Sequence, residues 1–443
     1  MTIVIFGNAP LTTEIDLPVT APGSRTWQIL KTVARATADQ DVEIVVFCLD
    51  DTPRSHIPAD GLMINVAPNA KVTFNPLPYE DFVRLGKEDY TGLPVPNSVR
   101  CVIGTGSTQP YATAAGFAEA MNVPLWIDVF GDPICETQSQ SEVQGNLTAE
   151  TAATQMVHVW KLFVDALLRA DRFSALSLRQ RHALLGQLGC TGRLNQHTVE
   201  SDFVTTIPYG VFEDDVPRTQ RIHTDDVFTV MWCGSFNTWM DVPTFVRGLA
   251  QALKAKPNLR LVVVGGSIPG YNEISYQQFL DGMKAEQLEG RISLMNWQSL
   301  GAMQKLYEQC DLGLSIDRFT YEAELGSRTR LVNFLAAGVP VASTVVTELS
   351  STLEDAGHLI PFELGDHEGL TEAILTAADT PPDQWNERHS RARAFVFSEF
   401  SAERLGGKLS DWVRNPIRTR DFGLQETNDL ITHVRAVRSE LGD

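Results

Sequence analysis

Short apolar runs alternate with stretches of helical periodicity along most of this chain, in two successive series. The runs are apolar at nearly every position, which is typical of strands in parallel sheets that helices cover on both faces. We therefore predict an α/β fold with two doubly wound parallel-sheet domains. The predicted strands are residues 3–6, 43–49, 100–103, 124–127 and 173–176 in the first series, and 227–232, 260–264, 291–295, 312–316 and 340–343 in the second.

The boundary between the two series lies in a polar, turn-rich segment from Pro208 to Asp226. Beyond Pro382 the helical periodicity continues without a further strand-like run. These changes predict a first domain at residues 1–212, a second at 222–395 and a helical tail at 396–443. The other predicted helices are 25–38, 111–121, 149–169, 242–254, 275–285, 300–309, 328–336 and 368–378.

Composition restricts the partners of this chain. Its 443 residues carry a net charge of −19, which argues against a nucleic acid as partner, because neutralising phosphates requires a basic face. The six cysteines lack metal-ligand spacing, so we predict a reduced compartment and no metal site. No apolar run approaches the roughly 18 residues of a spanning helix, and the first residues lack the basic flank of a signal peptide. A cytoplasmic location is the resulting prediction.

The stretch from Arg169 to Arg193 reverses this charge locally, with five arginines and His182 against the single acid Asp171. It is interpreted either as a solvated helix or as a basic patch that meets an anionic acceptor or a lipid head group. Any membrane contact through this patch would be peripheral.

The segment from Tyr321 to Val341 contains the densest set of candidate site residues. An apolar helix is predicted in it, because Gly338 and Pro340 supply stop signals beyond its end. Ser327 is expected to cap this helix, which would direct free N–H groups and the positive end of the helix dipole towards the neighbourhood of Glu324.

Charged residues at the start of the same helix indicate a ligand. Arg328 and Arg330, which follow Gly326 closely, suit an anion such as a diphosphate, whereas Glu322 and Glu324 offer acceptors for hydroxyl groups. A diphosphate joined to a polyol describes a nucleotide sugar. The alternative interpretation is a surface helix with scattered charges.

Loops at the carboxyl ends of parallel strands are the usual ligand sites of such sheets. In the first domain this rule selects residues that we expect to face the cleft, namely Gly7, Arg25, Ser107, Asp128 and Asp132. Asp128, Asp132 and Glu136 would bind a hydroxylated or cationic group or act as general base. A metal cluster is an alternative for the three acids, and a structural turn explains Asp132 in Gly-Asp-Pro.

Glycine-containing loops follow strands in both domains. Gly234 and Ser235 follow the first strand of the second series, and Gly265 and Gly266 follow the next, where they either admit a ligand close to the backbone or only turn the chain. The loop 104–109 partly matches a dinucleotide fingerprint, but Gln109 replaces its third glycine. We prefer a tight turn there, which delivers a helix cap.

A family resemblance rests on motifs that occur in order along both domains: Pro208-Tyr-Gly, Gly234-Ser235, Val264-Gly-Gly266, Glu324 and Ala336-Ala-Gly-Val-Pro340. With them the chain resembles the GT-B glycosyltransferases, and most of all the retaining family 4. The resemblance implies two Rossmann-like domains that face a cleft, a donor held mainly by the second domain, and C-terminal helices that cross back to the first. Departures from the pattern are Asn333 in place of the second glutamate of the family and no basic residue at 237–241.

The resulting functional prediction is a metal-independent, retaining glycosyltransferase that moves a sugar from a nucleotide sugar, by default a UDP-sugar, to a hydroxylated acceptor without any other cofactor. In such transfer the departing phosphate is thought to help deprotonate the acceptor. The predicted catalytic residues are Glu324, Arg328 and Asp128; the donor-binding residues are Gly234, Ser235, Gly265, Gly266, Glu322, Gly326, Ser327, Arg330 and Asn333; the acceptor-side residues are Gly7, Arg25, Ser107 and Asp132. A GT-B sugar-nucleotide epimerase and a non-catalytic binding or scaffold protein on the same fold remain the alternatives.

Overall fold

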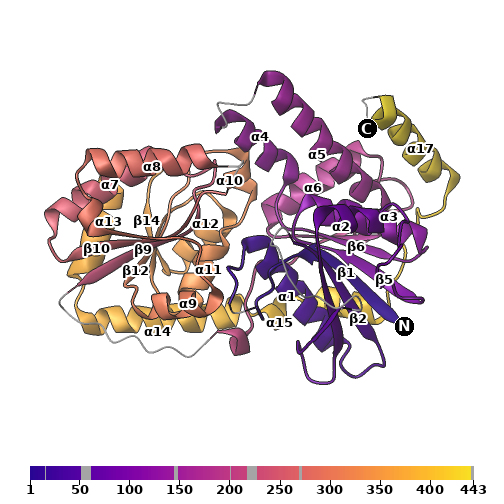
Figure 1. Ribbon diagram of the computed structural model, residues 1–443, viewed down its shortest axis with the longest axis horizontal. Coiled ribbons are helices and arrows are strands. Elements are labelled where there is room, and N and C mark those ends of the chain that lie inside the picture. Colours follow the sequence, from indigo (N-terminus) through magenta and orange to yellow (C-terminus); the bar gives the residue numbers. More distant parts are fainter. Residues whose placement is uncertain are drawn as a thin grey trace.

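The computed structural model describes residues 1–14, 16–50, 61–143, 148–199, 201–216, 227–268 and 272–440. Two sheets, each flanked by helices, lie side by side (Figure 1). The first sheet has the order β3-β4-β2-β1-β5-β6-β7-β8. Its strands are β1 (Thr2–Asn8), β2 (Glu43–Leu49), β3 (Leu62–Ile64), β4 (Lys71–Leu77), β5 (Val99–Gly104), β6 (Leu125–Val129), β7 (Arg172–Ala175) and β8 (Val204–Thr206). All pairs are parallel except that of the short edge strand β3 with β4.

The second sheet is parallel throughout, with the order β11-β10-β9-β12-β13-β14. Its strands are β9 (Phe228–Ser235), β10 (Leu259–Gly266), β11 (Ile292–Met295), β12 (Leu312–Ser315), β13 (Val341–Thr344) and β14 (Leu359–Phe362). The α/β fold with two parallel-sheet domains is therefore confirmed, and β3 is the described exception to a parallel arrangement. Most predicted strands recur within a few residues, whereas β3, β4, β8 and β14 were not predicted.

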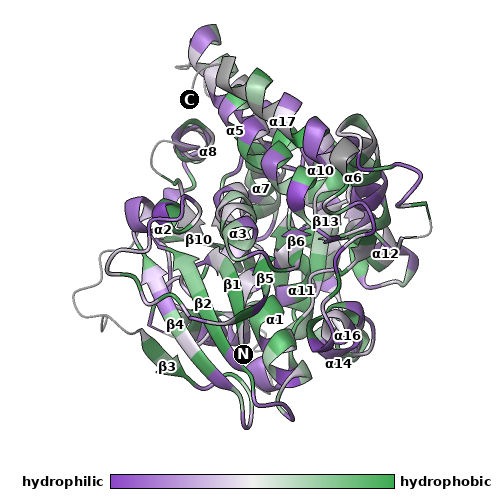
Figure 2. Ribbon diagram, turned by 90° about the vertical axis from the view of Figure 1, so that its right-hand side faces the viewer, coloured by the Kyte–Doolittle hydropathy of each residue, from purple (hydrophilic) through white to green (hydrophobic). Residues whose placement is uncertain are grey.

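Helices bury an apolar face against each sheet. Those of the first domain are α1 (Ala21–Ala36), α2 (Tyr79–Leu85), α3 (Thr108–Ala120), α4 (Pro133–Val143), α5 (Ala149–Arg169) and α6 (Leu178–Cys190). Those of the second are α7 (Val242–Ala255), α8 (Glu273–Ala285), α9 (Leu300–Glu308), α10 (Tyr321–Leu325), α11 (Thr329–Ala336), α12 (Glu348–Asp355) and α13 (His367–Asp379), with a short 3-10 turn at Glu289–Arg291. A further 3-10 turn, Glu213–Asp215, lies in the segment between the domains. Figure 2 shows hydrophobic residues concentrated on central strands such as β1, β2 and β5, while outer helices are largely polar.

The C-terminal tail returns from the second domain to the first, as the fold class predicted. Helix α14 (Pro382–Glu399) packs on α11, and Trp385 Nε1 donates to the carbonyl oxygen of Asp311 at 3.1 Å. The chain then continues through α15 (Ala402–Leu405) and α16 (Gly407–Arg414), which pack against α1. Trp412 of α16 meets Trp126 of β6 edge to face at a centroid distance of 5.4 Å. A last helix, α17, spans Gln425–Glu440.

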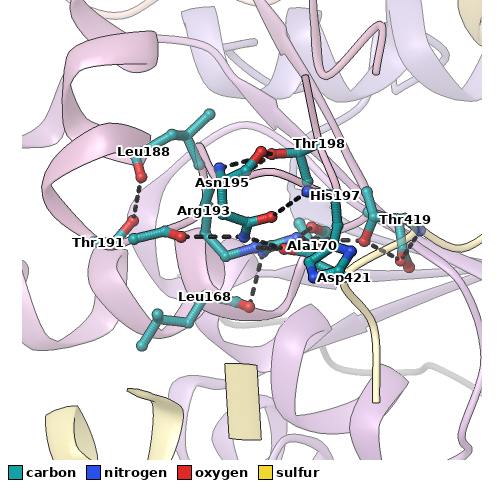
Figure 3. Close-up of polar contacts among 12 residues, drawn as sticks. Leu168, Ala170, Leu188, Thr191, Arg193, Asn195, His197, Thr198, Thr419 and Asp421 are labelled. Atoms are coloured by element: carbon teal, nitrogen blue, oxygen red, sulfur yellow. Dashed lines mark hydrogen bonds and ion pairs between the residues drawn. The ribbon is translucent and has the colours of Figure 1, made fainter. Parts of the chain in front are cut away.

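A buried arginine anchors the end of this tail (Figure 3). Arg193 donates from Nε to Asp421 at 2.9 Å and from its two Nη atoms to the carbonyl oxygens of Leu168 and Ala170 at 2.8 and 3.0 Å. Its side chain is 3% exposed, so Arg193 is not part of a basic patch on the surface. The basic-patch interpretation is therefore wrong for Arg193, because the carbonyl groups at the end of α5 and the carboxylate of Asp421 accept hydrogen bonds from its guanidinium. Arg181 likewise donates to the carbonyl oxygen of Val204 at 2.9 Å.

Candidate active site

A cavity of about 450 Å³ lies between the two domains, at the carboxyl ends of several strands. In the first domain it is lined by the start of α1 and by the loops after β5 and β6, and in the second by the loops after β9, β10 and β11 and the segment before α11. The predicted residues that line it are Ser107, Gly234, Ser235, Gly265, Glu322, Gly326, Ser327, Arg328, Arg330 and Asn333. This position is where parallel α/β sheets place their ligands.

Helix α11 begins one residue later than expected, and this changes the role of Ser327. Its N-cap residue is Arg328, and no side chain caps the helix. The prediction that Ser327 caps this helix is therefore wrong, because the chain turns into the helix at Thr329. The N–H group of Leu331 donates to the carbonyl oxygen of Arg328 at 2.9 Å, so only the N–H groups before it are left without an intrahelical partner, in a segment that lines the cavity.

Arg328 is held by two carboxylates. Its Nε donates to Asp317 at 2.9 Å, and its Nη1 and Nη2 donate to the two oxygens of Glu322 at 3.0 and 2.9 Å. The side chain is 4% exposed, and its guanidinium also lies 5.3 Å from the ring of Trp239. Arg328 nevertheless lines the cavity, so its predicted catalytic contact with a diphosphate stays a prediction, with two carboxylates already balancing its charge.

Arg330, two residues further on, has the opposite character. Its guanidinium lies 3.9 Å from the ring centre of Trp232, and its Nη1 is buried without a hydrogen-bond partner. Burial lowers the pKa of Arg330 from its ordinary value, but an arginine remains charged at neutral pH. A Cβ atom on Gly234 would lie 3.3 Å from Arg330 Nη2, which places the cation directly beside the loop after β9.

Two glycines shape the floor of the cavity beside Arg330. Gly234 and Gly265 have φ angles of +114° and +102°, which side chains other than glycine rarely adopt. A Cβ on Gly265 would lie 2.4 Å from the carbonyl oxygen of Gly234, so β9 and β10 could not approach as they do. Gly266 lies against the ring of Tyr276 instead and does not line the cavity.

The two carboxylates of the motif separate in space. Glu322 lines the cavity, and burial raises its pKa to about 7, an effect that the ion pair with Arg328 opposes. Glu324 is not among the residues that form the cavity wall, although it lies on the same short helix α10. The geometry thus favours Glu322 over Glu324 as the carboxylate that meets a ligand, contrary to the prediction of a catalytic Glu324.

Asn333 faces both the cavity and the segment that joins the domains. Its Oδ1 accepts a hydrogen bond from Tyr209 Oη at 3.1 Å. Tyr209 belongs to the Pro208-Tyr-Gly motif, and both residues also line a smaller pocket that adjoins the cleft. Asn333 therefore connects the cavity wall with the interdomain segment.

Asp128 and Arg25 do not face the cleft. They form an ion pair at 2.7 Å in which both side chains are 0% exposed, and Asp128 also accepts from Thr105 and Ser174 at 2.6 Å each. The remaining donors of Arg25 reach the carbonyl oxygens of Ile207 and Pro208 and the side chain of Gln28. The predictions of a catalytic Asp128 and an acceptor-side Arg25 are wrong, because the pair lies behind the wall and holds the interdomain segment.

Asp132 and Gly7 are also structural. Asp132 Oδ1 accepts from the backbone N–H groups of Ile134 and Cys135 at 3.0 and 2.9 Å, and its Oδ2 accepts from Gln187 at 2.6 Å. These bonds cap the start of α4, which is the turn-forming role that Gly-Asp-Pro allows. A Cβ on Gly7 would lie 2.4 Å from the side chain of Thr26, so this glycine lets α1 pack on β1.

The domain-one wall of the cavity instead presents hydroxyl groups and a carboxylate. It includes Ser107 and Thr108 at the start of α3, Tyr111 one turn later, and Glu136 of α4. Gly106, at a φ of +91°, makes the tight turn before α3, but Ser107 forms no side-chain cap bond at the N-cap position. The turn interpretation of this loop therefore fits, whereas the side-chain cap is absent.

Several lining residues were not predicted, above all Trp239, Trp297, Met303 and Tyr307. Trp297 follows β11 directly, so the rule on strand ends could have found it. Within the described ranges no group of three or more His, Cys, Asp or Glu residues is arranged to hold a metal ion. A search of the same residues finds no helix long and apolar enough to cross a membrane.

The two domains also contact each other beside the cavity. Ser139 of α4 and Thr238 after β9 share a buried hydrogen bond of 3.0 Å. At the start of α6 the backbone N–H groups of Leu178 and Arg179 donate to the two carboxylate oxygens of Glu348, at 3.0 and 2.9 Å. Because Glu348 belongs to α12 of the second domain, this contact joins both domains through a helix N-terminus.

Comparisons with known proteins give a sequence match to the second domain and a structural match to both domains. Residues 227–380 match the family model described as glycosyl transferases group 1. No curated protein sequence matches the chain. Among solved structures, a sucrose-phosphate synthase from Thermosynechococcus elongatus shares 16% identity and a TM-score of 0.63, over 93% of this chain and 98% of its own.

Two further structures show the same fold over nearly the whole length. Anabaena HepE in complex with UDP and glucose has 13% identity and a TM-score of 0.60, over 93% of this chain and 99% of its own. A UDP-forming trehalose-phosphate synthase from Burkholderia xenovorans has 12% identity and a TM-score of 0.60, over 94% and 98%. The second domain thus carries the sequence pattern of glycosyl transferases group 1, in a chain whose two domains together have the GT-B fold.

Proposed function

We propose that this protein is a glycosyltransferase that moves a sugar from a nucleoside-diphosphate sugar to a hydroxylated acceptor, with retention of configuration and without a metal ion. The observation that carries the proposal is the guanidinium of the half-buried Arg330, whose buried Nη1 has no hydrogen-bond partner in the cavity wall. A cation of this kind matches a diphosphate, which needs charge and hydrogen bonds together.

The chemistry follows from what each wall offers. In the transfer, the bond between the anomeric carbon and the diphosphate oxygen breaks, and negative charge grows on the leaving diphosphate. Arg330 and the N–H groups at the start of α11 would stabilise that charge without reorganisation. The acceptor hydroxyl bonds to the anomeric carbon on the same face, and its proton passes to the departing phosphate.

The donor nucleotide is proposed to be UDP. Anabaena HepE, which shares the fold, has been solved with UDP-glucose. Trp297 and Gln298 at the end of β11 offer an aromatic ring and an amide to the base, while Asn333 offers an amide to the ribose. The family match to residues 227–380 supports donor binding by the second domain.

The test measures nucleotide release from UDP-, GDP- and ADP-glucose, with and without a mixture of sugar acceptors. Release that depends on acceptor supports the transferase. Conversion of the nucleotide sugar without acceptor would instead indicate an epimerase, and binding without turnover would indicate a scaffold. Of the three acids that an epimerase would draw on, Asp128 and Asp132 lie behind the wall, and Glu136 alone lines the cavity.

A further inference from the structure

The two walls of the cleft differ in charge, and this difference bears on the acceptor. The domain-two wall contributes Arg330, which suits the diphosphate of a donor. Among the described residues that line the domain-one wall, Glu136 carries the only charge, and it is negative. The other polar side chains of this wall are the hydroxyl groups of Thr20, Ser24, Ser107, Thr108 and Tyr111.

The structure fixes the position of Glu136. Asp132 caps the start of α4 and is held in turn by Gln187, so the first turn of the helix cannot rotate freely. The N–H group of Glu136 donates to the carbonyl oxygen of Asp132 at 3.0 Å, which places Glu136 in that turn. Its Oε2 lies 3.8 Å from where a Cβ on Gly131 would be, so the carboxylate lies over a glycine of the cavity wall.

Tyr111 supplies a donor on the same wall of the cavity. Its hydroxyl oxygen accepts from the N–H group of Phe130 at 2.9 Å, which leaves the O–H group to donate. Burial raises the pKa of Tyr111 well above its ordinary value, with Asp128 adding to the effect, so the hydroxyl stays protonated. A carboxylate acceptor near a phenol donor and two aliphatic hydroxyls matches the hydroxyl groups of a polyol, which both donate and accept.

A second carboxylate approaches from the opposite wall. Glu322 of α10 lines the same cavity as Glu136, and α10 packs against α4. Burial is the main cause that raises the pKa of Glu322, and Glu136 adds to it. Glu322 is paired with Arg328, and Glu136 contributes a second carboxylate to the lining. A phosphate group placed there would meet electrostatic repulsion in a partly desolvated space.

We propose that Glu136 selects an uncharged, polyhydroxylated acceptor by accepting hydrogen bonds from its hydroxyl groups, and that it disfavours phosphorylated sugars. This inference rests on the proposed function and names the class of its second substrate. It separates the chain from the two fold relatives whose names describe the synthesis of sugar phosphates.

The experiment compares wild type with Glu136→Gln and Glu136→Lys, using UDP-glucose as donor. The acceptors are glucose, maltose and glycerol on one side, and glucose 6-phosphate and fructose 6-phosphate on the other. Glu150→Gln on the exposed start of α5 is the control, because it removes the same charge outside the cavity. Titration of UDP alone reports on the donor site, and circular dichroism reports on folding.

Wild type is expected to use neutral acceptors with a kcat/KM at least tenfold above that for sugar phosphates. Glu136→Gln should raise KM for the neutral acceptor roughly tenfold with kcat nearly unchanged, because uniform binding is lost. Glu136→Gln should also reduce the ratio of kcat/KM for neutral acceptors to kcat/KM for sugar phosphates. Glu136→Lys should reverse the preference, so that sugar phosphates become the better acceptors. The dissociation constant of UDP should stay within about twofold of wild type in each variant, since Arg330 is untouched.

Three outcomes would overturn the inference. The first is a sugar phosphate that serves wild type better than every neutral acceptor, and the second is a Glu136→Gln variant that behaves like Glu150→Gln. The third is UDP binding without transfer to any neutral acceptor, which refutes the acceptor class and leaves the donor site standing. If the wild-type protein did not bind UDP, the proposed function would be refuted as well.

Discussion

The two domains use arginine in opposite ways beside the same cleft. Arg25 of the first domain is fully buried, and its donors are consumed by Asp128, Gln28 and the interdomain segment. Arg330 of the second domain is stacked on Trp232 and keeps Nη1 without a partner. The difference shows that a charged residue at a strand end or helix start becomes a ligand site only when its neighbours leave its donors unused.

Arg328 sharpens this comparison because it is two residues from Arg330 in the same segment. Asp317 and Glu322 accept three hydrogen bonds from it, so its charge is balanced within the protein as that of Arg25 is, although Arg328 lines the cavity. Sequence spacing therefore separates these roles poorly. The hydrogen-bond partners of each arginine decide its role, and most of the predictions below remove one such partner or one donor.

The largest expected effect comes from Asp128→Ala, which leaves Arg25 buried without its counter-ion. The free energy of unfolding should fall by about 3–5 kcal/mol, the usual cost of breaking a buried ion pair. Urea unfolding measures this change. The exposed pair of Lys408 and Asp202, at 3.1 Å, provides the control, and Asp202→Ala should cost at most about 1 kcal/mol. If the Asp128→Ala variant were as stable as wild type but no longer bound UDP, Asp128 would be a residue of the binding site and the structural role would be contradicted.

Arg330→Met should lower kcat/KM for transfer by roughly 10²–10³-fold, comparable to the loss of a preorganised donor to a developing anion. UDP affinity should fall with it, because the cation meets the diphosphate in both the ground and the transition state. Arg330→Lys should recover part of the loss, since charge returns without the planar guanidinium. Calorimetric titration of UDP and steady-state kinetics measure the two effects.

The matched comparison for that variant is Arg328→Met. Since Asp317 and Glu322 hold the guanidinium of Arg328, its loss should appear first as lower thermal stability and as a smaller loss of UDP affinity. If Arg328→Met abolished UDP binding in a folded protein while Arg330→Met retained it, the division between the two arginines would be refuted.

The titration of Glu322, on the domain-two wall of the cavity, should make the stability of the protein depend on pH. Burial raises the pKa of Glu322 to about 7 from an ordinary value of 4.5, so the folded state holds the proton more tightly than the unfolded state. Its contribution to stability is complete below pH 4.5 and is lost as pH rises to about 7. We expect a decrease of about 1–3 kcal/mol over this window. Glu322→Gln should flatten that part of the curve, and an unchanged slope in thermal unfolding would contradict the assignment.

The sequence predicts the fold well because the central strands are apolar throughout and leave a clear pattern. The short strand β3 is apolar but only three residues long, and the other three strands it misses contain polar residues or proline. Strand β4 includes Asn75 and Pro76, β14 includes Pro361, and β8 is Val-Thr-Thr. Proline argues against a central strand, and short polar edge strands resemble loops.

The sequence predicts some residues of the candidate site correctly and others not. Gly234 follows from the strand-end rule and the family resemblance, and Arg330 follows from the charges at the predicted helix start; both line the cavity. The direction in which a side chain points does not follow from them. Asp128 and Arg25 are 103 positions apart, so their pairing emerges only when α1 packs against β6. Glu136 reaches the cavity because Asp132 fixes the start of α4, which spacing alone does not reveal.

The smallest expected effect concerns the contact between the domains at the start of α6. Glu348 of α12 accepts from the N–H groups of Leu178 and Arg179, and Arg179 Nη1 donates to the carbonyl oxygen of Val346 at 2.8 Å. These bonds place a second-domain carboxylate on a first-domain helix N-terminus, where negative charge is favoured by about 0.3–1 kcal/mol. They therefore bias the two domains towards the arrangement described here.

Glu348→Gln keeps one acceptor oxygen but removes the charge, so it should shift the domain equilibrium by about 0.5–1 kcal/mol towards more open arrangements, a two- to fivefold change in population. The radius of gyration of the ligand-free protein, measured by small-angle scattering, should increase slightly, and UDP should reverse the increase because it binds between the walls. Glu354→Gln, on the exposed face of the same helix α12, is the control for charge. Equal scattering curves for both variants would show that the carboxylate at α6 has no influence on closure, and the two walls would then be held together by the tail and the Ser139–Thr238 contact.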